Sequence, residues 1–131
     1  MKPLLVDTSA WIDFFSRHPN PALAIHIEKG RHTKRLATTE LVILEVTRGA
    51  RDPTEFCELQ AELSALMALP TADRHWVSAA KLGFLLGRKG LQPPSTDLLI
   101  ATIAIDYDCQ LLQRDKHFPQ IACYAPLRLL P

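Results

Sequence analysis

Apolar residues along the chain follow two alternating patterns: short continuous runs and longer stretches with helical spacing. The first run covers residues 2–6, and Trp11, Ile12, Phe14 and Phe15 follow it at intervals of one to three residues. A short apolar run that ends at a polar residue is typical of a buried strand, whereas the second spacing is typical of a helix with one buried face. The chain is therefore predicted to begin with a strand and a helix.

The same alternation continues to the end of the chain. The predicted strands are residues 2–6, 35–39, 66–70, 109–113 and 125–130. The predicted helices are residues 9–17, 21–30, 40–48, 52–69, 72–90 and 97–108. The helical pattern at 52–69 overlaps the brief apolar run at 66–70, which is the predicted third strand. Gly30 and Gly90 are expected to end two of these helices, and Ser95 or Thr96 to cap the last. Strands that alternate with helices favour an α/β domain with a mainly parallel sheet.

Length and composition fit one soluble globular domain that spans residues 1–131. Hydrophobic residues make up 47% of the chain and charged residues 22%, which argues against the disordered and fibrous classes. A chain of 131 residues can bury a core large enough to be stable without disulfides or structural metals. No internal repeat or linker indicates a second domain.

The cysteines and the net charge limit which cellular compartment and which binding partners the protein can be expected to have. Cys57, Cys109 and Cys123 form an odd set without C-x-x-C spacing, so neither a disulfide framework nor a zinc site is expected. Lys2 precedes only a brief apolar run, and no stretch reaches the roughly 18 residues of a membrane span. We therefore expect a cytoplasmic protein with no membrane partner. The net charge of +1 provides no strong basic field that would by itself indicate nucleic acid.

Four acidic residues fall where a parallel sheet binds its ligands. Asp7 ends the first predicted strand, and Asp115 follows the strand at 109–113. Asp97 lies in the first turn of a predicted helix, and Glu45 lies about one and a half turns into another, among apolar neighbours. Ligands of open parallel sheets bind beyond the carboxyl ends of the strands. All four carboxylates can therefore converge at one edge of the sheet.

Each acid taken alone also has an ordinary structural explanation. The alternatives are a helix cap for Asp7, free backbone N–H groups for Asp97, a turn for Asp115, and an ion pair with Arg48 or Arg51 for Glu45. Taken together the acids are harder to explain, because unit charges ~4 Å apart repel by roughly 4 kcal/mol at an effective dielectric near 20. A cluster would need cations. Oxygen ligands without histidine or cysteine nearby indicate Mg²⁺ or Mn²⁺ rather than zinc.

The segments that carry these acids resemble a known family. They read "LLVDTSAWIDFF", "TTELVILEVTRGAR", "STDLLIATIAI" and "LLQRDKHFPQIA". Together they resemble the PIN domain, and in particular the small single-domain endoribonuclease toxins of the VapC type, over nearly the whole chain. Departures are Gln113, where relatives often carry Thr, and the added proline in "QPPSTD". The resemblance implies a three-layer α/β/α fold around a mainly parallel sheet of four to five strands.

The resemblance also implies a chemistry for the acids. Asp7, Glu45, Asp97 and Asp115 would be the catalytic, metal-binding carboxylates for Mg²⁺ or Mn²⁺. The metal would activate water for attack on an RNA phosphodiester and leave a 5′-phosphate and a 3′-hydroxyl. The hydroxyl of Thr8 or Ser9 resembles the one that supports the first acid in the family.

Substrate and protein partners are predicted on weaker signals. Candidate RNA contacts are Arg35, Arg48, Arg114 and Lys116. The densest basic segment, residues 29–35, is equally well explained as a solvated loop. The apolar content of residues 56–69 indicates helices that pack against a second copy, as in a homodimer, or against an inhibitor. The resemblance implies that this inhibitor is a VapB-type antitoxin whose extended tail reaches the acidic pocket. His117 is expected to be a rim or packing residue.

Two other functions remain open on the sequence. A metal-dependent DNA nuclease or phosphatase could use the same acidic edge, although "DTS" lacks the second Asp of a D-x-D motif and no phosphate-binding loop is present. A non-catalytic RNA-binding or interaction domain is the other alternative, and the presence of all four acids argues against a degenerate site. Trp11, Phe14 and Phe15 could form a base-stacking platform, but the core explanation is favoured.

Overall fold

Five short strands form one parallel sheet in the computed structural model, which describes residues 2–130. The strands are β1 (Leu4–Val6), β2 (Leu36–Thr38), β3 (Met67–Ala68), β4 (Gln110–Leu112) and β5 (Arg128–Leu129). Their order is β3-β2-β1-β4-β5, and every neighbouring pair is parallel. The predicted parallel sheet is confirmed, and each predicted strand is present in shortened form.

The central strand β1 is the most buried part of the sheet. Leu4 lies opposite Leu36 of β2 on one side and Gln110 of β4 on the other. Leu4, Leu5 and Val6 are all buried, with exposures of 1% or less. A parallel strand with helices on both faces needs an apolar side chain at every position, which explains the continuous run in the sequence.

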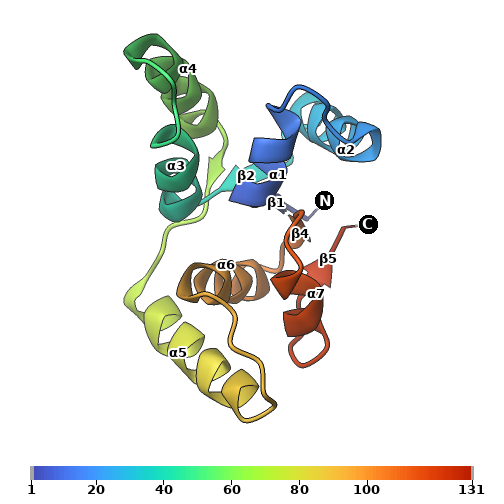
Figure 1. The fold of residues 1–131 in the computed structure, drawn as a ribbon, viewed down its shortest axis with the longest axis vertical. Helices are drawn as coiled ribbons and strands as arrows, with labels where there is room; N and C mark the ends of the chain where they lie inside the picture. Colours follow the sequence, from blue (N-terminus) through green and yellow to red (C-terminus); the bar gives the residue numbers. More distant parts are fainter. Residues whose placement is uncertain (1, 131) are drawn as a thin grey trace.

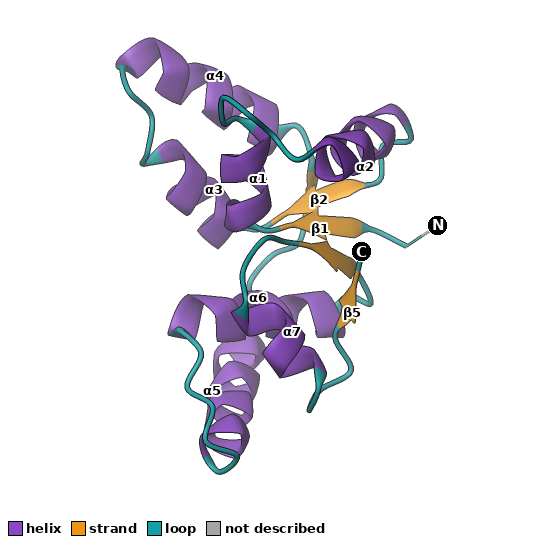
Figure 2. Ribbon diagram, turned by 45° about the vertical axis from the view of Figure 1, so that its right-hand side comes forward, coloured by secondary structure: helices purple, strands orange, loops and turns teal. Residues whose placement is uncertain are grey.

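Seven helices cover the two faces of this sheet. They are α1 (Thr8–Phe14), α2 (Pro21–His32), α3 (Glu40–Thr47), α4 (Pro53–Ser64), α5 (Asp73–Gly87), α6 (Ser95–Asp106) and α7 (His117–Ala122). Figure 2 shows α1 to α4 on one face of the sheet and α5 to α7 on the other. The three-layer α/β/α arrangement is therefore confirmed. In Figure 1, α5 lies beyond α6 as seen from the sheet.

Several helix boundaries differ from those predicted. The helix α2 continues past Gly30 to His32, because Gly30 is buried and serves packing. A Cβ at this position would lie 2.4 Å from Cδ2 of Leu36, so the glycine permits close approach to β2 and does not end the helix. The helix α5 ends at Gly87, and Gly90, with φ +80°, lies in the turn that follows.

Two further helix predictions are wrong in detail. Ser95 and Thr96 lie inside α6, and its N-cap is Pro94, which has no side-chain hydrogen bond to offer. The helix α4 stops at Ser64, because the residues that follow turn into β3. The short helix α7 was not predicted at all.

The core lies on both sides of β1. Trp11 and Phe118 are fully buried, one from each helical layer. Phe14 is partly buried against this core, whereas Phe15 is 43% exposed. The core explanation is thus confirmed for Trp11 and Phe14, and Phe15 lies at the border with solvent.

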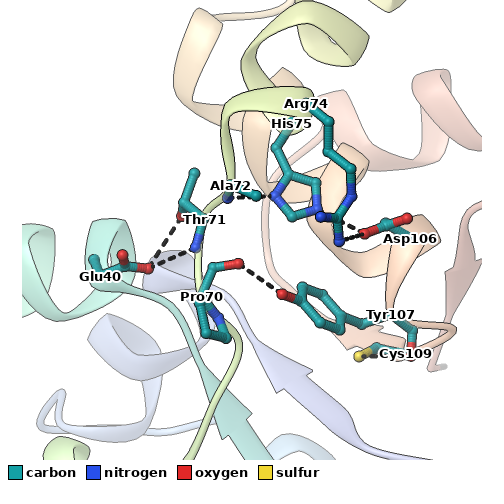
Figure 3. Close-up of polar contacts among 9 residues, drawn as sticks. All are labelled: Glu40, Pro70, Thr71, Ala72, Arg74, His75, Asp106, Tyr107 and Cys109. Carbon is teal, nitrogen blue, oxygen red and sulfur yellow. Dashed lines mark hydrogen bonds and ion pairs between the residues drawn. The ribbon is translucent and has the colours of Figure 1, made fainter.

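A buried histidine fastens the start of α5 to the end of α6 (Figure 3). His75 is 1% exposed, and its Nδ1 accepts a 2.8 Å hydrogen bond from the N–H of Ala72. Nε2 must then carry the proton, and it lies 2.7 Å from Oδ2 of Asp106. Arg74 donates to the same carboxylate oxygen at 2.8 Å. Both ring nitrogens of His75 therefore have a structural partner.

The loop that precedes α5 is held by two further contacts (Figure 3). The hydroxyl of Tyr107 donates to the carbonyl oxygen of Pro70 at 2.8 Å. Glu40, in the first turn of α3, accepts hydrogen bonds from both the N–H and the hydroxyl of Thr71 at 3.1 Å. These contacts link α3, the loop and α6, and so help to fix α6 relative to the sheet.

Across residues 2–130, none of the helices combines the length and the apolar character that crossing a bilayer requires.

Candidate active site

Three of the four predicted acids lie around the carboxyl ends of β1 and β4. Asp7 directly follows β1, Asp115 lies three residues past β4, and Asp97 is in the first turn of α6. The N–H of Asp7 donates to the carbonyl oxygen of Leu112 at 2.9 Å, which fixes it beside β4. The chain builds the sheet outward from β1 in one direction to β3 and then returns to add β4 on the other side. Crevices at such a switch in strand order are where open α/β sheets bind ligands.

Asp7 is buried and held by its neighbour Ser9. The Asp7 carboxylate caps α1 by accepting the Ser9 N–H at 3.0 Å, and it also accepts the Ser9 hydroxyl at 2.6 Å. The Ser9 oxygen in turn accepts the N–H of Arg114 at 2.9 Å. Of the two hydroxyls proposed to support the first acid, Ser9 is the one that contacts it, and it also joins β1 to the loop after β4.

Glu45 reaches the same region from α3. This helix begins at Thr39, whose Oγ1 accepts the Val42 N–H at 3.2 Å, and Glu45 lies half-buried on its second turn. The hydroxyl of Thr8 donates to Oε1 of Glu45 at 2.8 Å. Arg51, one of the ion-pair partners considered for Glu45, pairs with Glu55 at 2.8 Å.

Asp97 and Asp115 converge with His117. One ligand atom from each of Asp97, Asp115 and His117 lies within 4.8 Å of the other two. Nδ1 of His117 is 2.6 Å from Oδ1 of Asp115 and 3.1 Å from Oδ2 of Asp97. The expectation that no histidine lies near the acids is therefore wrong.

The loop between β4 and α7 positions this histidine. The N–H of Asp115 donates to Oε1 of Gln113 at 2.6 Å, and the N–H of His117 donates to Oδ1 of Asp115 at 2.9 Å. Phe118 and Ile121 are fully buried and anchor α7 against the core. The three-residue spacing of Phe118 and Ile121 is the one sequence feature that points to α7, and it is weak because the helix has only six residues.

Burial and mutual repulsion shift the protonation of the acids. Burial raises the pKa of Asp97 to about 7, and the hydrogen bond with Asp115 and the charges of Asp115 and Asp7 add to this effect. Burial also raises the pKa of Asp7, and the charge of Glu45 contributes. Burial acts to raise the pKa of Asp115 too, but hydrogen bonds from the His117 N–H and from Asp97 hold it below the ordinary value. Asp97 and Asp115 thus share one proton near neutral pH.

A divalent cation fits this set of groups. Oδ2 of Asp97 and Nδ1 of His117 are inaccessible to solvent, yet neither makes a hydrogen bond of good geometry. Buried polar atoms that lie close together without bonding one another are unusual, because each loses its hydration. A cation held by Asp97, Asp115 and His117, with Asp7 nearby, would satisfy these atoms and replace the shared proton.

Two of the four predicted RNA contacts border the acids. The guanidinium of Arg114 is half exposed, and its Nε lies 3.5 Å from Oδ2 of Asp13. Lys116 is exposed between Asp115 and His117. Arg48 is also exposed, at the C-cap of α3, one turn beyond Glu45.

Arg35 lies at the amino ends of the strands, opposite the acids, so it does not belong to the site where it was predicted. It precedes β2, so it is at the amino ends of the strands, away from the acids. Its Nε donates to the carbonyl oxygen of Lys2 at 2.6 Å, and its guanidinium also bonds the side chain of Gln110. These contacts give Arg35 a structural role in joining β1, β2 and β4.

A groove of about 700 Å³ opens beside Glu45, between α1, α3 and α4. Its apolar surface is formed by Ile12, Phe15, Val46 and Leu59. Its charged lining comprises Glu45, Glu55, Glu58, Glu62 and Arg51, and two of these glutamates are ion-paired, Glu55 with Arg51 and Glu62 with Arg31. The groove therefore combines apolar side chains with an excess of negative charge, and Glu45 is the site acid that lines it.

Comparison with known proteins gives relatives along almost the whole chain. The VapC ribonuclease Mb1587 from Mycobacterium bovis is 28% identical over 123 residues, which cover 91% of each chain. A DNA-bound VapBC structure from Salmonella typhimurium matches with a TM-score of 0.80 at 18% identity, over 99% of this chain and 98% of that one.

VapBC2 from Rickettsia felis, bound to a DNA fragment from its promoter, matches with a TM-score of 0.78 at 22% identity, over 97% and 96% of the two chains. At such identities the solved structures establish a shared fold only. The PIN domain family itself matches residues 4–123, which include all four acids and His117. The chain therefore belongs to the PIN domain family.

Proposed function

We propose that the protein is a metal-dependent endoribonuclease, the toxin of a type II toxin–antitoxin pair, which hydrolyses RNA phosphodiester bonds. The observation that carries this proposal is the convergence of Asp97 and Asp115 with unpartnered buried ligand atoms beside Asp7. Membership of the PIN domain family and the M. bovis relative named as a VapC ribonuclease support it.

Asp7, Glu45, Asp97 and Asp115 are the catalytic acids in this proposal. Asp97, Asp115 and Asp7 would hold Mg²⁺ or Mn²⁺ together with Glu45, whose charge acts on Asp7. Such an ion lowers the pKa of bound water and stabilises the charge that develops on the phosphate. The chain's own contribution is to hold the carboxylates in place. Ser9 holds Asp7 and Thr8 holds Glu45 by hydrogen bonds. These bonds keep the two carboxylates in position even without a bound cation to offset their mutual repulsion.

RNA reaches the acids past positive side chains. Arg114 and Lys116 flank Asp115 and are exposed, so they are available to the phosphates on either side of the bond that is cut. Arg48 extends this positive charge along α3. Phosphate contacts of this kind supply affinity without sequence preference. The proposal therefore leaves the choice of RNA to other contacts.

The antitoxin is proposed to bind in the groove beside Glu45. Its apolar side chains fit those of a short segment, and the excess of negative charge in its lining favours a basic side chain near Glu45. Two of the solved structures with the same fold are VapBC structures, from Rickettsia felis and Salmonella typhimurium, which supports a VapB-type partner.

A second copy of the chain is proposed to cover the outer face of α5. Four large apolar side chains of this helix are more than half exposed: Trp76, Val77, Phe84 and Leu85. Leu44 of α3 is 60% exposed. Apolar exposure on this scale is typical of an interface. We propose a homodimer that acts in the cytoplasm.

The proposal is tested by incubating the purified protein with a labelled RNA and a DNA of the same sequence. RNA cleavage in Mn²⁺ or Mg²⁺, its loss in chelator and intact DNA are the expected results. Cleavage of DNA at a similar rate would favour the DNA nuclease alternative. Persistent RNA cleavage in chelator would contradict the metal-dependent mechanism.

A further inference from the structure

Nδ1 of His117 lies within the acid cluster, close to carboxylate oxygens of both Asp97 and Asp115. Nδ1 is 2.6 Å from one oxygen of Asp115 and 3.1 Å from one oxygen of Asp97. These three residues come from two different segments, the first turn of α6 and the start of α7. Their ligand atoms fit within 4.8 Å of one another, which is the spacing of groups that share an ion.

Ion pairs with the two acids explain the short distances of Nδ1 but leave this atom without a well-formed hydrogen bond. A histidine that only neutralised the acids would orient its N–H along a carboxylate lone pair, yet Nδ1 makes no hydrogen bond of good geometry. The atom is also hidden from solvent, so water does not satisfy it. The contrast with His75 is informative, because both nitrogens of that buried ring have partners and it leaves nothing for a ligand.

The backbone holds the His117 ring in this position before any ligand arrives. The His117 N–H donates to Oδ1 of Asp115, which ties the histidine to its neighbouring acid. Phe118 is fully buried directly after it and prevents α7 from rotating. A ligand residue whose backbone is fixed in this way loses little conformational entropy when it binds an ion.

We propose that His117 is a nitrogen ligand of the metal ion, through Nδ1, and that it makes this site favour Mn²⁺ over Mg²⁺ more strongly than carboxylates alone would. The inference rests on the proposed function, because it concerns the same ion. Carboxylates suit Mg²⁺ and Mn²⁺ alike, whereas imidazole suits transition metals. Mg²⁺ keeps oxygen ligands and several waters, so an imidazole in the cluster gives it little benefit.

The test is a spectroscopic measurement on the whole protein loaded with Mn²⁺. Pulsed electron paramagnetic resonance detects a nitrogen that is bonded to Mn²⁺. We expect an imidazole nitrogen coupling in the wild type, its loss in His117→Gln, and its retention in His32→Gln, which changes an exposed histidine at the end of α2. Calorimetric titrations of wild type and His117→Ala with Mn²⁺ and with Mg²⁺ provide the second readout.

The titrations should show an affinity for Mn²⁺ that falls at least about tenfold in His117→Ala, the loss that removal of even an outer-shell partner can cause. The affinity for Mg²⁺ should change much less. A wild type that binds Mn²⁺ without nitrogen coupling would overturn the role of His117 and leave the proposed nuclease intact. Equal losses of the two ions, or a gain for both in His117→Ala, would overturn the selectivity. Failure of the wild type to bind Mn²⁺ at all would overturn both proposals.

Discussion

The hydroxyl of Thr8 donates a 2.8 Å hydrogen bond to Oε1 of Glu45, and this contact joins the end of β1 to α3. The next residue, Ser9, donates its hydroxyl to Asp7 at 2.6 Å. Two adjacent hydroxyls therefore fix two acids that lie 38 positions apart in the chain (7 to 45). The orientation of both carboxylates depends on one dipeptide at the start of α1.

Replacement of Thr8 by Val should impair cleavage with little effect on folding. The variant keeps the shape of the side chain but leaves Glu45 free to rotate, and loss of a group that orients an acid at a metal site typically costs about 10- to 100-fold in affinity or activity. The free energy of unfolding should change by only about 1 kcal/mol, the usual net value of one hydrogen bond. RNA cleavage at saturating Mn²⁺ and urea denaturation are the measurements.

Thr33→Val is the matched control, because the Thr33 hydroxyl donates to the carbonyl oxygen of Lys29 at the end of α2, remote from the acids. It should cleave RNA at the wild-type rate. Equal activity of Thr8→Val and wild type would show that Glu45 needs no support from the Thr8 hydroxyl.

Replacement of Ser9 by Ala should weaken metal binding and stability together. The Ser9 hydroxyl lowers the pKa of Asp7 against the effect of burial, so its removal makes the ionised form of Asp7 less favourable. The N–H of Arg114 also loses its acceptor. We expect a lower affinity for Mn²⁺ by calorimetry and a loss of stability of about 1–2 kcal/mol by denaturation. An unchanged affinity would argue against Asp7 as a metal ligand.

Stability in chelator should fall as pH rises from about 4 to about 7. The pKa of Asp97 is 3.8 in the unfolded reference and about 7 in the folded protein, so between these values the folded state binds more protons than the unfolded state. A raised pKa favours folding at low pH, and that benefit is lost as pH rises through the folded value. For one group the slope is at most about 1.4 kcal/mol per pH unit.

Asp97→Asn isolates this effect because it removes the titrating group. Chemical denaturation of both proteins across pH 4–7 should show a smaller decline in the variant, and saturating Mn²⁺ should reduce the decline in wild type. Parallel curves for the two proteins in chelator would contradict the assignment of the raised pKa to Asp97.

Replacement of His75 by Phe should destabilise the fold without altering the active site. The variant keeps a ring of similar size but removes the acceptor for the Ala72 N–H and the donor to Asp106. Loss of these bonds in a residue that is 1% exposed should cost about 2–3 kcal/mol. Denaturation measures the loss, and Mn²⁺ affinity below the unfolding transition should match wild type. A large drop in affinity would mean that this contact also positions Asp97.

The positions of the acids were predictable from the sequence because they follow from sheet geometry. The apolar runs before Asp7 and Asp115 mark two strands, and parallel strands end at one edge. Glu45 and Asp97 could be placed there because their helices start close to that edge. Nothing beyond strand and helix assignment was needed for this part of the site.

The histidine and the arginine were misplaced for different reasons. His117 depends on α7, a helix of six residues, and on a hydrogen bond to Asp115, neither of which leaves a strong periodic signal. Arg35 was grouped with the basic segment before it, whereas the start of β2 carries it to the edge opposite the acids. The formation of a short helix and the end of the sheet at which a residue lies depend on tertiary packing, which local sequence patterns do not reveal.

The most direct test of the central claim is the rate of RNA cleavage by homogeneous Asp97→Asn in Mn²⁺, compared with wild type and with Asp73→Asn, which changes an exposed acid in the first turn of α5. The expected result is loss of cleavage in Asp97→Asn alone, with its stability in chelator at pH 7 equal to or above that of wild type because repulsion is relieved. Cleavage by Asp97→Asn at the wild-type rate would contradict the claim that these converging carboxylates hold the ion on which hydrolysis depends.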